Sequence, residues 1–166
     1  MRILNLIDDA AGPVNARELS SLFDALDAVE PADLVGDWSG GDFHDNENGQ
    51  NGAAVVPEGA VERTVHPCHA MLESYRWAGV VVESLENAMP VMTWTDEGKR
   101  VESEYWGRAQ IRSIKFRDVV SACCIFDRWP IIFHFRRVSD NTLMGFTDAK
   151  DKAMRDAGEY YFWLRK

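Results

Sequence analysis

The chain has 166 residues and a formal net charge of −9, which comes from 27 acidic against 18 basic side chains. This length suits one domain of roughly 100–150 residues, so we expect a single domain over residues 1–166, and the acidic balance argues against nucleic acid and membrane surfaces as partners. Three cysteines, two of them adjacent at Cys123 and Cys124, do not suit a disulfide framework and indicate a reducing, cytoplasmic location.

The first segment with a helical pattern covers residues 15–29. Asn15 can cap its N-terminus, and Glu18 follows three residues later, as in a capping box. Residues 34–43 come after this helix as a glycine-rich first strand that contains Trp38. The apolar residues that recur at helical spacing in the first segment are Leu19, Leu22, Phe23 and Leu26.

Residues 44–65 are rich in Asn, Gly and acidic side chains. We expect an insertion loop there, because few large apolar groups are present to offset the entropy of ordering the chain. A short helix is predicted to begin at Pro67, since the missing N–H of proline costs nothing in a first helical turn. Such a helix can plug a barrel end, and its apolar face consists of Met71, Leu72 and Tyr75.

From Trp77 onward the hydrophobic period shortens towards two, which is typical of strands. Short polar connections favour sequential antiparallel hairpins, and with the first strand the total is about eight, enough to close a barrel around side chains or one small ligand. We therefore predict a mainly β fold, an antiparallel β-barrel, with residues 149–158 as a surface loop or helical turn. The predicted strands cover residues 77–85, 90–94, 104–116, 119–126, 131–138, 142–147 and 160–164.

Gly36, Trp38 and Gly40 form a G-x-W-x-G motif after the predicted helix. On this motif and the later segments given below, the chain resembles the GXWXG protein family and its companion C-terminal domain of unknown function, over most of its length. The resemblance implies a lipocalin-like barrel, similar also to nitrobindin-type proteins, and it implies little about chemistry. The later segments are His66-Pro67, Met71-Leu72-Glu73, Trp77, Gly107-Arg108-Ala109, Val120-Ser121-Ala122, Asp127, Pro130-Ile131-Ile132, His134-Phe135-Arg136, Asp140-Asn141-Thr142-Leu143, Gly145, Asp148 and Tyr161-Phe162.

The chain departs from the family pattern in two places. Residues 44–65 are longer than the family's usual link between the Trp motif and the His-Pro motif, and a longer rim loop could act as a lid. Phe133 stands where relatives carry Asp beside the histidine. The resemblance therefore implies a more apolar cavity in this chain, without the acid–base role of that Asp.

Side chains alternate along the strand 131–138, so His134 lies on one face and Phe133 and Phe135 lie on the other. If His134 faces the interior, its unperturbed pKa near roughly 6.5 suits proton transfer at neutral pH, which makes it the first catalytic candidate. The alternative is a core or outward-facing histidine whose hydrogen bonds are satisfied.

Arg108 is the second catalytic candidate. It alternates with Gln110 and Arg112 along the predicted strand 104–116. An inward arginine could hold a carboxylate or an enolate-like oxygen by paired hydrogen bonds. The alternative is that this row of side chains is the solvated face of the strand.

Aromatic side chains are the main candidates for ligand binding, because their faces stack on planar apolar molecules. Ordinary barrel packing is the alternative for each of them. His66 and His69 lie three residues apart, but no further ligand pattern accompanies them, so we expect neither a metal nor a cofactor. The expected binding residues are Trp38, His66, Tyr105, Trp106, Phe133, Phe135 and Tyr161.

Three hypotheses for function follow. The first is a cofactor-independent enzyme that binds an apolar, polyketide- or terpenoid-like molecule and catalyses its isomerisation or cyclisation. The second is a carrier or sensor that holds a hydrophobic ligand unchanged. The third, borrowed from nitrobindin-type barrels, makes His134 or His66 an axial haem ligand. The expected partner is a hydrophobic small molecule, bound by a monomer or homodimer.

Overall fold

The structure, a computed structural model, describes residues 2–8, 16–45, 50–51 and 66–166. Its helices are α1 (Arg2–Asp8), α2 (Ala16–Asp24), the 3-10 helix η1 (Pro31–Leu34), α3 (Pro67–Ser74) and α4 (Lys152–Asp156). Its strands are β1 (Gly36–Asp42), β2 (His44–Asp45), β3 (Gln50–Asn51), β4 (Trp77–Ser84), β5 (Asn87–Trp94), β6 (Arg100–Glu102), β7 (Ala109–Phe116), β8 (Val119–Phe126), β9 (Ile131–Ser139), β10 (Thr142–Ala149) and β11 (Tyr161–Arg165).

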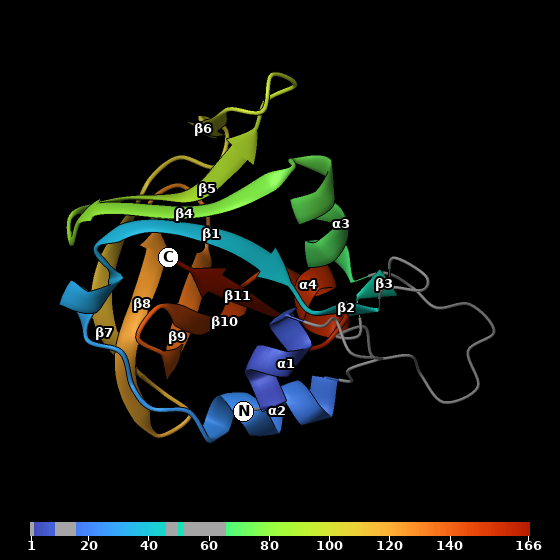
Figure 1. Cartoon of the computed structure of the whole chain (residues 1–166), viewed down its shortest axis with the longest axis vertical. Helices are drawn as coiled ribbons and strands as arrows, with labels where there is room; N and C mark the ends of the chain where they lie inside the picture. The colour runs from blue at the N-terminus through green and yellow to red at the C-terminus, as the bar shows by residue number, and fades with distance from the viewer. Residues whose placement is uncertain (1, 9–15, 46–49, 52–65) are drawn as a thin grey trace.

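Eight of these strands close into an antiparallel barrel (Figure 1). The order around the barrel is β1, β11, β10, β9, β8, β7, β5 and β4, and β4 pairs with both β5 and β1 to complete the ring. From β7 to β10 each strand pairs with the next one in the sequence, as expected from the short polar connections, and β10 pairs with β11 across a longer connection that contains α4. The predicted mainly β, lipocalin-like barrel is confirmed.

The strand β7 begins at Ala109, although the sequence pattern predicted a strand from residue 104. Residues 103–108 form a turn in which Gly107 has a φ of 71°, a conformation that suits glycine and breaks the strand. Ala109 opposite Ala88 is the single residue pair between β7 and β5, so this is the seam with the shortest pairing in the ring.

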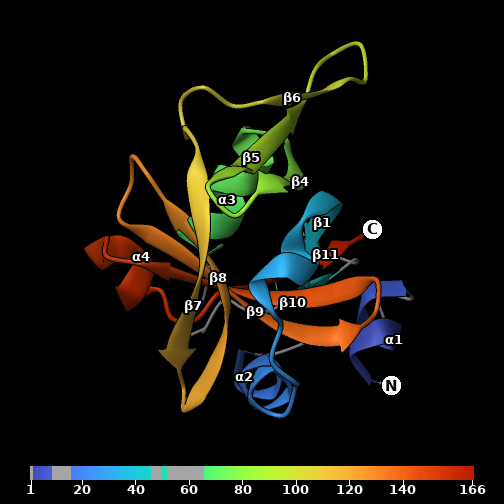
Figure 2. The same ribbon diagram turned by 90° about the vertical axis from the view of Figure 1, so that its left-hand side faces the viewer.

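The helices α1 and α2 lie on the outside of the barrel; in Figure 2 α2 lies below β9, and α1 lies beside the end of β10. The buried Phe23 of α2 packs 5.6 Å from the ring of Tyr161 and 6.2 Å from that of Phe146. The helix α2 ends at Asp24, earlier than the predicted end at residue 29, because Asp27 already pairs with Arg137 of β9 in an isolated bridge.

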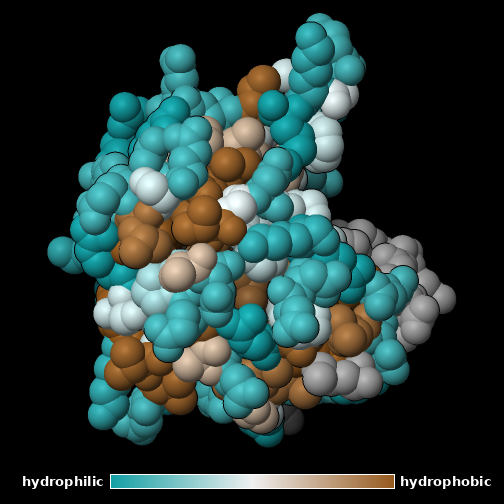
Figure 3. All heavy atoms as spheres, turned by 60° about the vertical axis from the view of Figure 1, so that its left-hand side comes forward, coloured by the Kyte–Doolittle hydropathy of each residue, from teal (hydrophilic) through white to brown (hydrophobic). Residues whose placement is uncertain are grey.

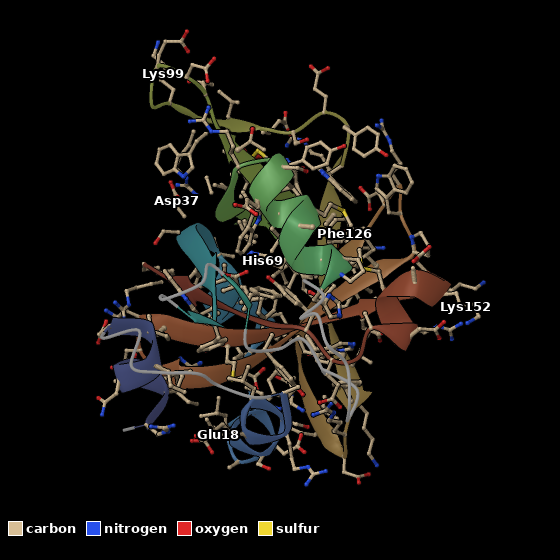
Figure 4. All side chains as sticks on the ribbon, turned by 90° about the vertical axis from the view of Figure 1, so that its right-hand side faces the viewer. Glu18, Asp37, His69, Lys99, Phe126 and Lys152 are labelled. Atoms are coloured by element: carbon tan, nitrogen blue, oxygen red, sulfur yellow. The ribbon has the colours of Figure 1, made fainter. Side chains whose placement is uncertain are left out.

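The helix α3 lies across one end of the barrel, as the sequence predicted for a plug helix (Figure 4). At the other end η1 packs against β7 and β8. The indole N–H of Trp38, the central residue of the G-x-W-x-G motif, donates to the carbonyl of Leu34 at 2.8 Å. Trp38 therefore ties the first strand to the helix that covers the far end.

Aromatic rings fill the interior of the barrel. Phe133 lies 4.8 Å from Phe162 and 5.0 Å from Phe126, measured between ring centroids, and Phe135 lies 6.0 Å from Phe162. A Cβ atom on Gly145 would lie 2.2 Å from the Phe162 ring, so glycine at this position makes room for it. These contacts make the interior a packed hydrophobic core.

The predicted insertion loop 44–65 is described only at β2 and β3, which pair antiparallel through His44 opposite Asn51. The rest of that loop lies outside the described residues, as does residue 15 of the predicted first helix.

Within the described part of the chain, helices long and apolar enough to cross a bilayer are absent. In the view of Figure 3, hydrophobic side chains are exposed in separate places on the surface, with hydrophilic side chains between them.

Candidate functional site

Three hollows surround α3 at the end of the barrel that it covers. The mouth cavity, of about 30 Å³, lies between α3 and the barrel; the α4 cleft, of about 350 Å³, lies beside α4; and the Trp77 groove, of about 310 Å³, lies on the side of β1. The mouth cavity is lined by Cys68, Met71, Leu72, Tyr75, Val91, Trp106, Phe126, Ile131, Phe133, Thr147, Ala149 and Met154. The α4 cleft is lined by His66, Cys68, Phe116, Arg117, Phe146, Thr147, Asp148, Ala149, Met154, Arg155, Gly158 and Tyr160. The Trp77 groove is lined by Gly40, Gly41, Asp42, His69, Leu72, Glu73 and Trp77.

The mouth cavity is apolar and small, with room for about two water molecules. Of the residues predicted to bind a ligand, Trp106 and Phe133 line it, while Phe135 lies deeper in the packed core. The space for a larger ligand therefore lies around α3 rather than deep inside the barrel.

His66 begins α3 and lines the α4 cleft. Its Nδ1 accepts a hydrogen bond from the backbone N–H of Cys68 at 3.1 Å, and its Nε2 donates to the carbonyl of Gly158 at 3.0 Å. Burial lowers the pKa of His66, which matches this neutral, doubly bonded ring. The imidazole also packs at a tilt against Tyr160, with the ring centroids 5.0 Å apart, so His66 both caps the helix and shapes the cleft wall.

His134 faces outward from β9, beneath α2, and not into the barrel interior with Phe133 and Phe135. Its Nε2 lies 3.0 Å from Oδ2 of Asp148, and its ring stacks on Phe116 with the centroids 3.9 Å apart. Burial lowers the pKa of His134, against the opposing effect of the Asp148 carboxylate. The pair therefore joins a buried neutral imidazole to a half-exposed carboxylate that lines the α4 cleft.

Arg117 also lines the α4 cleft, where it joins the barrel to α2. Its guanidinium donates to Asp24 of α2 at 3.1 Å and to Glu159 at 2.6 Å. Tyr161, predicted to stack on a ligand, is instead fully buried against Phe23, and its hydroxyl donates to Glu159 at 2.8 Å. Burial raises the pKa of Tyr161 to about 12.

The remaining predicted site residues lie apart from the three hollows. Arg108 donates to Glu102 at 2.8 Å and to Asn87 at 2.9 Å, half exposed at the seam between β5 and β7. Tyr105 is half exposed and stacks on Tyr75, with the ring centroids 5.6 Å apart. Trp38 lies at the opposite end of the barrel.

The cysteine that reaches the candidate site is Cys68, which lines both the mouth cavity and the α4 cleft. Burial raises the pKa of its thiol to about 12, so the nucleophilic thiolate is scarce at neutral pH. The same cause raises the pKa of Cys123 to about 11. Acid–base chemistry by carboxylate and imidazole suits this end of the barrel better than thiol chemistry.

Sequence reasoning missed three side chains that the fold places at these hollows: Asp42, Asp148 and Tyr160. Asp42 follows the G-x-W-x-G motif after one glycine, and its Oδ2 lies 2.5 Å from Nδ1 of His69. The hydroxyl of Tyr160 donates to the same oxygen. Groups of three or more His, Cys, Asp or Glu side chains able to hold a metal ion are absent from the residues that the structure describes.

Two family models match the sequence. Residues 21–55 and 58–98 match the model described as GXWXG protein, and residues 107–166 match a domain of unknown function, DUF4334. The fold is similar to the crystal structure of a protein from Thermomonospora curvata, with a TM-score of 0.77 and 26% identity over 99% of this chain and 95% of that one. The search of curated proteins found no match.

Proposed function

The chain belongs to the GXWXG protein family and carries its companion DUF4334 domain, and we propose that it binds an apolar small molecule at the α3 end of the barrel and catalyses its cofactor-independent isomerisation or cyclisation. The barrel and its aromatic clusters are consistent with binding a hydrophobic ligand. The isomerisation or cyclisation is the part of the proposal that goes beyond ligand binding.

The observation that carries the proposal is that the hollows beneath α3 adjoin each other. The mouth cavity and the α4 cleft share four lining residues, and the proposal places the ligand in the cleft with an apolar part directed towards the mouth. Binding sites of about 300–1,000 Å³ with apolar walls and few polar groups are typical for small molecules. The shared residues are Cys68, Thr147, Ala149 and Met154.

Acid–base chemistry in the cleft would come from Asp148 and His134. A neutral His134 donates its Nε2–H to Asp148, which fixes the direction of the carboxylate. Asp148 can then accept a proton from the ligand and return it at another atom. Such a proton shift changes neither the composition nor the oxidation state of the ligand, and therefore requires no cofactor.

Because substrate and product are isomers, they have equal mass, and the experiment searches for such a pair of compounds. The purified protein is incubated with a small-molecule extract of its producing organism, and liquid chromatography with mass spectrometry is used to find a compound that is consumed while an isomer of equal mass appears. We expect the conversion to be slower by roughly a hundredfold or more for Asp148→Asn and for His134→Gln, the range for losing an acid–base group. Conversion that is equally fast with both variants would contradict the role of this pair.

A non-catalytic carrier is the second candidate, and the apolar lining of the mouth cavity favours it. A carrier would retain a compound from the extract without converting it. Binding of an extract compound that both variants and the wild type leave unchanged would favour the carrier over the isomerase or cyclase.

A further inference from the structure

Asp42, His69 and Tyr160 form a second hydrogen-bonded cluster, in which Asp42 and His69 line the Trp77 groove and Tyr160 lines the α4 cleft. The Oδ2 atom of Asp42 lies 2.5 Å from Nδ1 of His69 and also accepts from the hydroxyl of Tyr160. The side chains of Asp42 and His69 are each 11% exposed. Figure 4 shows His69 between α3 and β1.

The contact with Asp42 places a hydrogen on Nδ1 of the imidazole. An ionised carboxylate only accepts hydrogen bonds, so Nδ1 of His69 carries a hydrogen and donates it to Asp42. In the neutral ring Nε2 then holds the lone pair, and it lies 3.8 Å from Oε2 of the exposed Glu73. A carboxylate that holds Nδ1–H in this way orients a histidine for proton transfer at Nε2 and stabilises the imidazolium that forms.

The Trp77 groove gives this histidine a place for a flat ligand. Trp77 and Leu72 supply its apolar walls, and Asp42 and His69 supply its polar side. A Cβ atom on Gly40 would lie 2.4 Å from the Trp77 ring, so the last glycine of the G-x-W-x-G motif allows this indole to lie against β1. The motif therefore shapes the groove next to Asp42.

We propose that His69, oriented by Asp42, is a catalytic residue that moves a proton on a planar, unsaturated ligand held against Trp77. The inference rests on the proposed function, because it assumes that an apolar molecule binds around α3. Leu72 lines both the groove and the mouth cavity, so the two hollows are neighbours at α3.

The step is balanced within the ligand and the imidazole. The Nε2 lone pair takes a proton from a carbon next to an electron-withdrawing group, such as a carbonyl, and the electron pair of that C–H bond moves into the adjacent π-system. The imidazolium then returns the proton to a different carbon. Substrate and product are isomers, so no oxidant or reductant takes part.

The test uses 5-nitrobenzisoxazole, a flat aromatic probe that opens to a coloured cyanophenolate when a base removes its C–H proton and the N–O bond breaks. We expect the full chain to accelerate this opening with saturation kinetics. His69→Gln should lower kcat by roughly a hundredfold with KM little changed, and Asp42→Asn should lower kcat in the same direction. Added imidazole should restore part of the rate in His69→Ala, which a purely structural role would not allow.

The control for Asp42→Asn is Asp118→Asn, because the side chain of Asp118 is 98% exposed at the turn between β7 and β8. Its kcat should equal that of the wild type. A wild-type rate no faster than that of free imidazole at equal concentration, or an unchanged kcat in His69→Gln, would overturn the inference. Neither result would decide the proposed function, which depends on conversion of a compound from the extract.

Discussion

His134 and Asp148 meet across the β9–β10 hairpin, with 3.0 Å between Nε2 and Oδ2, although they are not directly opposite each other. His134 pairs with Phe146, so Asp148 is its diagonal neighbour two residues further along β10. Diagonal neighbours on one face of a sheet are within reach of long side chains. Through this contact a buried imidazole on the outer face of the barrel is linked to the α4 cleft.

Acid should destabilise the protein, because burial lowers the pKa values of both His66 and His134. The unfolded chain, with histidine pKa values near about 6.5, takes up these protons first as the pH falls. Stability present above that pH is therefore lost as the pH falls through the lower folded-state values. Urea unfolding followed at pH 7 and pH 5 should show this loss.

The variant His134→Gln should lose less stability between the same two pH values, since one of the titrating groups is gone. Asp148→Asn should lose more, because the carboxylate that favours the charged imidazole has been removed. Equal losses in the wild type and both variants would show that His134 does not contribute to the acid sensitivity.

Gly79 should tolerate alanine much less than Gly98 does, although both have positive φ, of 108° and 75°. A Cβ atom at position 79 would lie 2.0 Å from the carbonyl oxygen of Trp38, whereas at position 98 it would meet nothing within 4 Å. We expect Gly98→Ala to cost about 1–2 kcal/mol from backbone strain alone, and Gly79→Ala to cost about 1–3 kcal/mol more. Chemical denaturation of the two variants measures this difference, and equal costs would contradict the close approach of β4 to β1.

Phe135→Ala should destabilise the barrel by about 3–5 kcal/mol, because the ring is 1% exposed and packs on Phe162. Leu85→Ala is the matched surface change, since Leu85 is 37% exposed, and surface changes usually cost within about 0.5 kcal/mol. Urea denaturation of both variants checks the prediction. A small cost for Phe135→Ala would indicate a loosely filled interior instead of a packed one.

Arg117→Ala should loosen α2 from the barrel. The guanidinium holds Asp24 of α2 at 3.1 Å and also Ser20 at 3.0 Å. We expect faster hydrogen exchange of the amides in Ala16–Asp24, while those of the interior strands β8 and β9 keep their protection. Arg76→Ala is the control, because Arg76 is half exposed and pairs with Asp96, far from α2 in sequence. Unchanged exchange in α2 after Arg117→Ala would contradict the anchoring role.

Much of the fold is readable from the sequence because the barrel strands are regular. The strand β8 occupies Val119–Phe126, the same residues that the sequence pattern predicts as a strand. The turn before β7 was missed because it contains Tyr105 and Trp106, and aromatic residues are enriched in strands. The helix α1 was not predicted, because it carries only the two buried residues Ile3 and Leu6, too few to give a clear helical period.

The candidate site was less predictable, because it depends on which face of each strand points inward. A shift of one residue exchanges the faces, and the alternation in β9 alone leaves both orientations open for His134. The hairpin turn at residues 139–141 does not supply the missing information, because a β-bulge between Thr142 and Leu143 shifts the register by one residue, and only this shift places Asp148 diagonal to His134. The contact between Asp42 and His69 joins residues 27 apart through the path of the chain around α3, which no local pattern encodes.

Native mass spectrometry with a blocked site tests most directly whether an apolar molecule binds beside α4. Met154 lines both the mouth cavity and the α4 cleft, so Met154→Trp fills the space that they share, whereas Val120→Trp adds the same ring at a position that is 59% exposed on β8. After incubation with extract, we expect a bound small molecule on the wild type and on Val120→Trp, and its loss from Met154→Trp. The same bound mass on all three proteins, or a bound mass on none of them, would contradict binding at this end of the barrel.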